Sequence, residues 1–283
     1  MLYLIPGIPM TTRTLIVHSH EQETAKKIAQ EIQGEIEKNK KHFRIHTKTE
    51  FDIDNLRTGN SVDLNIFDYN FDYSNIKLMV SDMDSTLISI ETIDEVAKEV
   101  GLYSEVSLIT EEAMQGNLDF SESFKKRLSI LKGVRTESFE AVFNNRMNLN
   151  PGARELITFF SSNQIKTALV SGGITYFAEK VKNNLGIDTF KANKVEIIDE
   201  SITGNALGKV VDGKAKAGYI DELCEFYDIN SEQVIAIGDG ANDLEMMKVA
   251  GLSVAYKGKP ILRKDCNIQI NHSGLDCLID FFE

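Results

Sequence analysis

Short apolar segments rich in β-branched residues recur along the last two thirds of the chain, separated by stretches of helical or loop character. They are KLMVSD (77–82), KTALVS (166–171), VIAIGD (234–239) and LSVAY (252–256). Strands that alternate with helices predict a mainly parallel sheet, so we expect a Rossmann-like α/β core. Ligands of such sheets bind beyond the carboxyl ends of the strands, and the first three segments end there in Asp or Ser. The chemistry is therefore expected at that edge.

The region before this sheet predicts a small α/β unit. A strand is expected over 14–17 and further strands over 42–50 and 62–67. Between them, apolar residues at helical spacing predict one amphipathic helix that carries Ala25, Ile28, Ala29, Ile32 and Ile36. The polar stretch DYNFDYS (68–74) reads as a linker.

These patterns predict three parts. Residues 1–74 form an N-terminal α/β appendage of unknown role, and residues 75–91 with 149–283 form the core. Residues 92–148 form a helical cap inserted after the first core strand. Thr92, with Glu95 three residues later, has the pattern of a capping box at the start of that cap.

Composition excludes several classes of protein. The chain has 43 acidic and 31 basic residues and a net charge of −12, so we expect no nucleic-acid partner and no membrane surface as partner. Its three cysteines show no CxxC pair, which argues against a disulfide framework and a zinc site and favours a cytoplasmic location. The opening MLYLIPGIPM lacks the basic residues of a secretory signal, and translation from Met1 or from Met10 both stay open.

Two carboxylates, Asp82 and Asp84, follow the first core strand directly. Both can project into the crevice at the sheet edge, where one can attack while the other moves protons. The alternative is an ordinary turn with acidic caps. A calcium-binding EF-hand loop is excluded, because its glycine and its bidentate glutamate would fall at Leu87 and Ile93.

Three further motifs lead to the same edge. Ser171 and Gly172 end the second strand at a turn whose backbone N–H groups suit phosphate, although an ordinary strand-to-helix turn explains them equally well. Lys216 lies where a helix begins and where a cation is unfavourable, which suggests a functional role for this lysine. Lys214 is an alternative candidate for the same role. Asp239 ends the third strand, and Asp243 follows at a helix start, where it could simply be a cap.

Considered together, these acidic strand ends need a cation. Carboxylates crowded at one sheet edge repel each other unless a positive charge compensates them. Oxygen ligands without histidines favour Mg²⁺.

The four motifs DMDSTLI, SGG, a spaced lysine and GDGANDL, in this order, resemble the haloacid dehalogenase superfamily of phosphohydrolases, and their wording is similar to its phosphoserine phosphatase branch. The resemblance spans residues 76–283. It implies that Asp82 is the nucleophile and that Asp84 is the general acid, which later activates water. It also implies that Mg²⁺ is held by the carboxylates of Asp82 and Asp239 and by the backbone carbonyl of Asp84, with Asp243 orienting a bound water or Lys216.

The same resemblance assigns the phosphoryl oxygens to four residues, which are Ser171, Gly172, Lys216 and Asn242. It makes Glu91 the ligand of the substrate ammonium and Arg127 the ligand of its carboxylate, with Phe120 closing over the site. Independently, Arg127 lies on an apolar helix stripe with Phe120, Phe124 and Leu131, although its guanidinium could also reach solvent. Glu91 could simply favour a helix start.

The expected activity is magnesium-dependent hydrolysis of O-phospho-L-serine through a phospho-aspartate, which in this family is the last step of serine biosynthesis. The partner is a small phosphoester, and the sequence says nothing about the oligomeric state. Two alternatives stay open. One is a capped phosphatase that acts on another small ester or transfers phosphate to an alcohol; the other is a non-catalytic sensor in which the appendage binds an amino acid.

Overall fold

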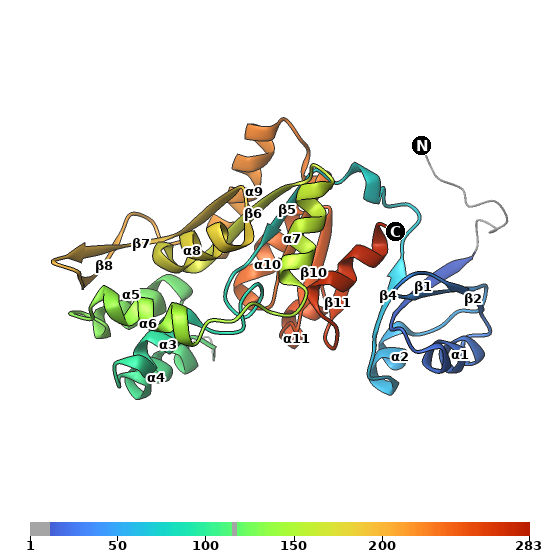
Figure 1. Cartoon of the computed structure of the whole chain (residues 1–283), viewed down its shortest axis with the longest axis horizontal. Helices are drawn as coiled ribbons and strands as arrows, with labels where there is room; N and C mark the ends of the chain where they lie inside the picture. Colours follow the sequence, from blue (N-terminus) through green and yellow to red (C-terminus); the bar gives the residue numbers. More distant parts are fainter. Residues whose placement is uncertain (1–11, 115–117) are drawn as a thin grey trace.

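A computed structural model of the chain describes residues 12–114 and 118–283. The described part contains two sheets and a cluster of helices arranged along one long axis (Figure 1). The four-stranded sheet lies at one end, beside the C-terminus, and the helical cluster lies at the other end. The choice between Met1 and Met10 falls outside the described residues.

The four-stranded sheet is antiparallel and has the strand order β2-β3-β1-β4. Its strands are β1 (Arg13–His18), β2 (Glu35–Lys38), β3 (Phe43–Thr47) and β4 (Asp63–Phe67). The helices α1 (Gln22–Glu31) and α2 (Ile53–Gly59) pack on one face of it. The apolar residues of β1 and β3 meet Ala25 and Ile28 of α1 in a small separate core.

The prediction that Ile36 belongs to the first helix is wrong. The helix ends at Glu31, Gln33 takes a left-handed φ of 51°, and Ile36 lies in β2. Gly34 packs so closely on β3 that an added Cβ would lie 2.4 Å from Cγ2 of Ile45. This close approach turns the chain into a strand although the helical spacing continues.

The second sheet has seven strands in the order β11-β10-β9-β5-β6-β7-β8, all parallel except β8. Its strands are β5 (Leu78–Ser81), β6 (Lys166–Ile174), β7 (Thr189–Ile198), β8 (Ser201–Leu207), β9 (Val234–Gly238), β10 (Leu252–Tyr256) and β11 (Ile268–Ile270). The predicted parallel α/β sheet is confirmed, and its four predicted strands are β5, β6, β9 and β10.

Helices cover both faces of this sheet, because side chains alternate along the buried strands. Met79 of β5 faces one apolar core, and Leu78 and Val80 face the other. The first core holds α7 (Ala153–Ser162), α8 (Thr175–Leu185) and the 3₁₀ segment η4 (Leu275–Phe281). The second holds α9 (Gly213–Tyr227), α10 (Leu244–Val249) and α11 (Pro260–Arg263). Three short 3₁₀ segments lie in the connections: η1 (Tyr73–Asn75), η2 (Ser231–Gln233) and η3 (Ala241–Asp243).

Between β5 and α7 the chain forms the helical cluster. Its helices are α3 (Thr92–Glu99), α4 (Tyr103–Met114), α5 (Phe120–Ile130) and α6 (Thr136–Asn145). The chain enters and leaves the cluster side by side, where Ile88 bridges Leu149. The cluster lies below the β7–β8 hairpin in Figure 1, and α5 contacts β8.

The four-stranded unit is docked on the rest of the chain through apolar residues such as Ile16 and Phe67, which pack in the main core, and through polar side chains. The amide of Asn65 in β4 accepts from the backbone N–H of Gln269 at 2.9 Å and donates to its carbonyl at 3.0 Å, as a neighbouring strand would. The Asp63 carboxylate accepts from the N–H groups that follow β11, at Asn271, His272 and Ser273. The edge strand β11 is thereby covered.

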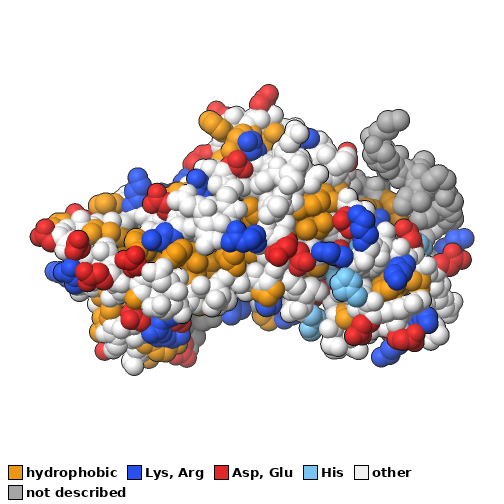
Figure 2. Space-filling view, viewed as in Figure 1, with side chains coloured by type: hydrophobic (Ala, Val, Ile, Leu, Met, Phe, Trp, Pro, Cys, Tyr) orange, Lys and Arg blue, Asp and Glu red, His pale blue; other side chains and the backbone are white. Residues whose placement is uncertain are grey.

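The surface carries no broad positive face in the view of Figure 2, where acidic and basic side chains are interspersed. Among the described helices, none combines the length and apolarity needed to cross a membrane. Cys224, Cys266 and Cys277 are all free.

A fragment that begins at Tyr73 is expected to fold but to be less stable. Deleting the four-stranded unit removes the Asp63 and Asn65 contacts, and hydrogen bonds to charged groups contribute roughly 1.5–3 kcal/mol each. We expect the free energy of unfolding to fall by about 3 kcal/mol or more in urea titrations. A chain that begins at Thr12 is the control for shortening, and equal urea midpoints for the two would show that the docking contributes nothing.

Candidate active site

The carboxyl ends of β9, β5 and β6 lie side by side, because these strands are adjacent and parallel. Asp82 follows β5, Asp239 follows β9, and Ser171 lies near the carboxyl end of β6. The sheet order therefore brings together side chains that are more than 60 positions apart in the sequence.

A buried lysine joins two of the carboxylates. Nζ of Lys216 lies 2.8 Å from Oδ1 of Asp82 and 2.7 Å from Oδ1 of Asp243. The relative exposures of these residues are 0% for Lys216, 3% for Asp82 and 0% for Asp243. Lys214, the competing lysine, is exposed. Lys216 is thus the cation of the site.

These contacts shift the pKa values of the group. Burial alone would lower the pKa of Lys216, but the carboxylates of Asp243 and Asp82 outweigh it and raise that pKa. Burial, and then the charge of Asp243, raises the pKa of Asp82, against the effect of Lys216. Burial and then Asp243 also raise the pKa of Asp239 to about 7. One lysine therefore does not compensate the whole cluster.

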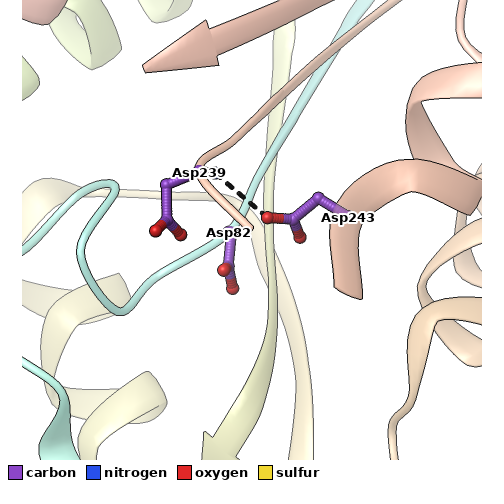
Figure 3. Close-up of side chains that lie close together, drawn as sticks. All are labelled: Asp82, Asp239 and Asp243. Carbon is purple, nitrogen blue, oxygen red and sulfur yellow. Dashed lines mark hydrogen bonds between the residues drawn. The ribbon is translucent and has the colours of Figure 1, made fainter. Parts of the chain in front are cut away.

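Asp82, Asp239 and Asp243 form a group whose ligand atoms lie within 4.8 Å of one another (Figure 3). The oxygens of Asp243 already have partners. Oδ1 accepts from Lys216, and Oδ2 accepts from the backbone N–H groups of Asp239 at 3.0 Å and Gly240 at 3.1 Å. Asp243 thus braces the lysine and the turn, which leaves the carboxylates of Asp82 and Asp239 available to a cation.

The backbone carbonyl of Asp84 accepts no hydrogen bond from any residue that the structure describes. Together with the carboxylates of Asp82 and Asp239, this neutral oxygen would complete an oxygen donor set that suits a hard divalent ion such as Mg²⁺. The donor set thus fits a metal, because its carboxylates are crowded at one sheet edge: burial, and then the charge of Asp243, raises the pKa of both Asp82 and Asp239.

The β6 end of the site is tightly packed. β6 continues to Ile174, three residues beyond the predicted end at Ser171. The Ser171 hydroxyl accepts from the Gly173 N–H at 2.8 Å, and Asn193 donates to the Gly172 carbonyl at 2.8 Å. A Cβ added to Gly172 would lie 2.4 Å from the Phe120 ring, so the cap reaches directly over this turn.

Asp84 is held by the first residue of α3. Its carboxylate accepts from the Thr92 hydroxyl at 3.1 Å and from the Thr92 N–H at 3.4 Å. Burial, followed by the charges of Glu91 and Asp82, raises the pKa of Asp84, and the bonds from Thr92 oppose this. The capping-box prediction is wrong, because Glu91 is the N-cap residue of α3. The Thr92 hydroxyl donates a hydrogen bond to Asp84 instead.

Glu91 and Arg127 both line the same pocket. Glu91 is exposed and accepts from the Ser85 hydroxyl at 2.7 Å. The Arg127 side chain is only 11% exposed and donates no hydrogen bond to any described residue. Burial lowers its pKa. Arg127 therefore does not reach out to solvent, and its guanidinium lies at the pocket without a hydrogen-bond partner among the described residues.

One pocket is shared by most of the residues named from the sequence. It is lined by Asp82, Asp84, Glu91, Ile93, Phe120, Arg127, Ser171, Gly172, Gly173 and Asn242. Lys216, Asp239 and Asp243 are not in its lining; Lys216 and Asp243 are buried next to Asp82. Sequence reasoning included Gly173 only as part of the SGG motif, and it did not assign Thr92, Ile93 or Asn193 to the site. Thr92 was misinterpreted as a capping-box residue, and Ile93 and Asn193 belong to none of the four motifs.

Comparison with known proteins gives a consistent result. Residues 76–251 match the family model of the haloacid dehalogenase-like hydrolases. The phosphoserine phosphatase of Polaromonas sp. is 44% identical over 212 residues, which cover 73% of this chain and 90% of that protein. A solved structure of a HAD family hydrolase from Salmonella enterica serovar Typhi has a TM-score of 0.88 at 29% identity, covering 96% of this chain and 99% of its own. A structure described as a phospho-aspartyl intermediate analogue of phosphoserine phosphatase has a TM-score of 0.68 at 39% identity, covering 73% and 98%.

Replacing Lys216 by Met is expected to destabilise the fold. The change leaves Asp82 and Asp243 buried without their cation, and breaking a buried pair in this way typically costs about 3–5 kcal/mol. The free energy of unfolding is measured by urea titration at neutral pH in a chelator. Lys214→Met is the matched control and should change it by no more than about 0.5 kcal/mol. Equal effects of the two changes would mean that Lys216 does not hold the carboxylates.

Proposed function

The chain belongs to the haloacid dehalogenase-like hydrolases, and we propose that it is a phosphoserine phosphatase that hydrolyses O-phospho-L-serine through a phospho-aspartate on Asp82. One observation carries this proposal. A pocket that contains a nucleophile paired with a buried lysine also contains Arg127, a buried arginine without a hydrogen-bond partner among the described residues. The first group suits phosphate transfer, and the second suits a substrate carboxylate.

In the first half of the reaction, the Asp82 carboxylate attacks the phosphorus and the bond to the serine oxygen breaks. Asp84 gives its proton to that oxygen, and the raised pKa of Asp84 favours the protonated form that an acid needs. In the second half, Asp84 takes a proton from the water that attacks the phospho-aspartate, and phosphate leaves.

The phosphoryl oxygens are assigned to Ser171, Gly172, Lys216 and Asn242. Ser171, Gly172 and Asn242 line the pocket, and Lys216 contacts Asp82. Fixed donors at this end can stabilise the charge that spreads over the phosphoryl group in the transition state.

Mg²⁺ is the proposed cofactor, held by the carboxylates of Asp82 and Asp239 and by the backbone carbonyl of Asp84. When bound, it would offset the negative charge of the phosphoryl group and of these carboxylates. Asp243 orients Lys216, as its 2.7 Å contact with Nζ suggests.

Recognition of the serine moiety is assigned to the cap. Glu91 takes the ammonium, Arg127 takes the carboxylate, and Phe120 covers the bound substrate. The low exposure of Arg127 supports a role inside the pocket, and the contact between Phe120 and Gly172 supports a closed arrangement.

We propose a division of the chain that follows these roles. Residues 75–91 and 149–283 are the phosphatase core, residues 92–148 are the cap, and residues 1–74 are an appendage not required for chemistry. About a quarter of this chain has no counterpart in a phosphoserine phosphatase of which it covers 98%, which supports the last point. Free cysteines support a cytoplasmic location.

Phosphate release from phosphoserine tests this function. The protein should release phosphate with Mg²⁺ and should lose activity in a chelator. Asp82→Asn should abolish release, because an amide has nearly the same shape but is not an anionic nucleophile. Circular dichroism checks that the variant is folded. Mass spectrometry should find the trapped phosphoryl group on Asp82, and finding it on Ser85 or Ser171 would refute the mechanism.

Arg127→Ala tests the substrate assignment. Loss of a charge-assisted contact in a closed site typically costs about 2–5 kcal/mol, so kcat/KM for phosphoserine should fall roughly 30-fold or more. Activity on p-nitrophenyl phosphate, which has no carboxylate, should fall far less. Lys126→Ala, an exposed neighbour on the same helix, is the control. Equal losses on both substrates would assign Arg127 to the phosphate or to cap position, and the reaction would be that of a general capped phosphatase.

A further inference from the structure

Behind Arg127 lies a second charged group that also lacks hydrogen bonds. Asp94, the third residue of α3, has its Oδ1 3.8 Å from the nearer terminal guanidinium nitrogen of Arg127 on α5. Oδ1 of Asp94 and Nε of Arg127 are both buried without a hydrogen-bond partner among the described residues. The two side chains are only 16% and 11% exposed.

Burying such an ion pair without hydrogen bonds lowers the stability of the fold. Buried ions need compensation by charge and by hydrogen bonds, and here the charges compensate each other while the hydrogen bonds are missing. The guanidinium is planar and has donors along more than one edge, so it can face one carboxylate on one side and a second carboxylate on another. Asp94 is not in the pocket lining, whereas Arg127 is. Arg127 therefore lies between the pocket and Asp94.

We propose that Asp94 is a positioning residue that holds the Arg127 guanidinium in the orientation that accepts the substrate carboxylate. It acts through Arg127 and does not contact the substrate. This inference rests on the proposed phosphoserine activity and adds a specificity determinant to the same site.

Position on the helix supports this role. Asp94 lies in the first turn of α3, three residues after the N-cap residue Glu91. Glu95, the next residue, instead turns its carboxylate to Lys98 at 2.5 Å and to Arg146 at 3.3 Å. Of these two acidic residues in the first turn of α3, Glu95 pairs with Lys98 and Arg146, and Asp94 pairs with Arg127.

Asp94→Asn removes the charge and retains the shape. We expect KM for phosphoserine to rise about 10-fold, the effect of roughly 1.4 kcal/mol, with kcat nearly unchanged. Activity on p-nitrophenyl phosphate should stay within about 2-fold, and Asp94→Glu should recover part of the loss. Glu95→Gln is the matched control and should leave KM for phosphoserine unchanged. A normal KM in Asp94→Asn, or equal losses on both substrates, would overturn the proposal.

The double variant Asp94→Asn with Arg127→Ala gives a second test. Because Asp94 acts through Arg127, the double variant should be no worse on phosphoserine than Arg127→Ala alone, and fully additive losses would refute the coupling. The urea midpoint of the double variant should be no lower than that of Arg127→Ala, because Arg127→Ala alone leaves the Asp94 carboxylate without its cation; this readout needs no substrate. Wild-type protein that is inactive on phosphoserine would refute the proposed function, whereas additive shifts of the urea midpoints would refute the pairing itself.

Discussion

The buried contact of Lys216 with Asp82 and Asp243 is the interaction on which the rest of the site depends. Buried carboxylates cannot lie close together at a water-poor sheet edge without a cation, and Lys216 supplies one positive charge for Asp82 and Asp243. Lys216 is the fourth residue of α9, and a positive charge near a helix N-terminus is unfavourable with respect to the helix dipole, so its position slightly destabilises the helix. Burial, and then the charge of Asp243, raises the pKa of Asp239, so a divalent ion bound at this edge would offset negative charge that Lys216 leaves uncompensated.

In the proposed mechanism, chemistry and recognition are divided between two parts of the chain. Groups suited to phosphate come from the strand ends of the core, whose positions follow from the sheet order. Groups suited to a charged leaving group come from α3, α5 and the loop before them. Phe120 over Gly172, and Thr92 against Asp84, connect the two parts, so cap position and the orientation of the acid are physically coupled.

Much of the fold could be predicted, and the failures have local causes. The strands β5, β6, β9 and β10 were recognised because buried parallel strands are continuous apolar runs. The β7–β8 hairpin was missed because its strands are only partly buried and carry mixed residues, and its tight turn uses Asp199 and Glu200 at positive φ rather than glycine. Ile36 was placed in a helix because helical spacing cannot register the close packing of Gly34 on Ile45.

By itself the sequence determined the order of motifs along parallel strands, and hence that Asp82, Ser171 and Asp239 meet at one edge, because the ends of adjacent parallel strands coincide. It left open whether Lys214 or Lys216 was the cation, whether Arg127 reached solvent and what Thr92 bonded. Only the tertiary structure decided these points. Each depends on which side chain is buried against a residue distant in sequence. A buried charge or hydroxyl costs free energy unless it is paired or hydrogen-bonded, so its partner is set by the tertiary structure.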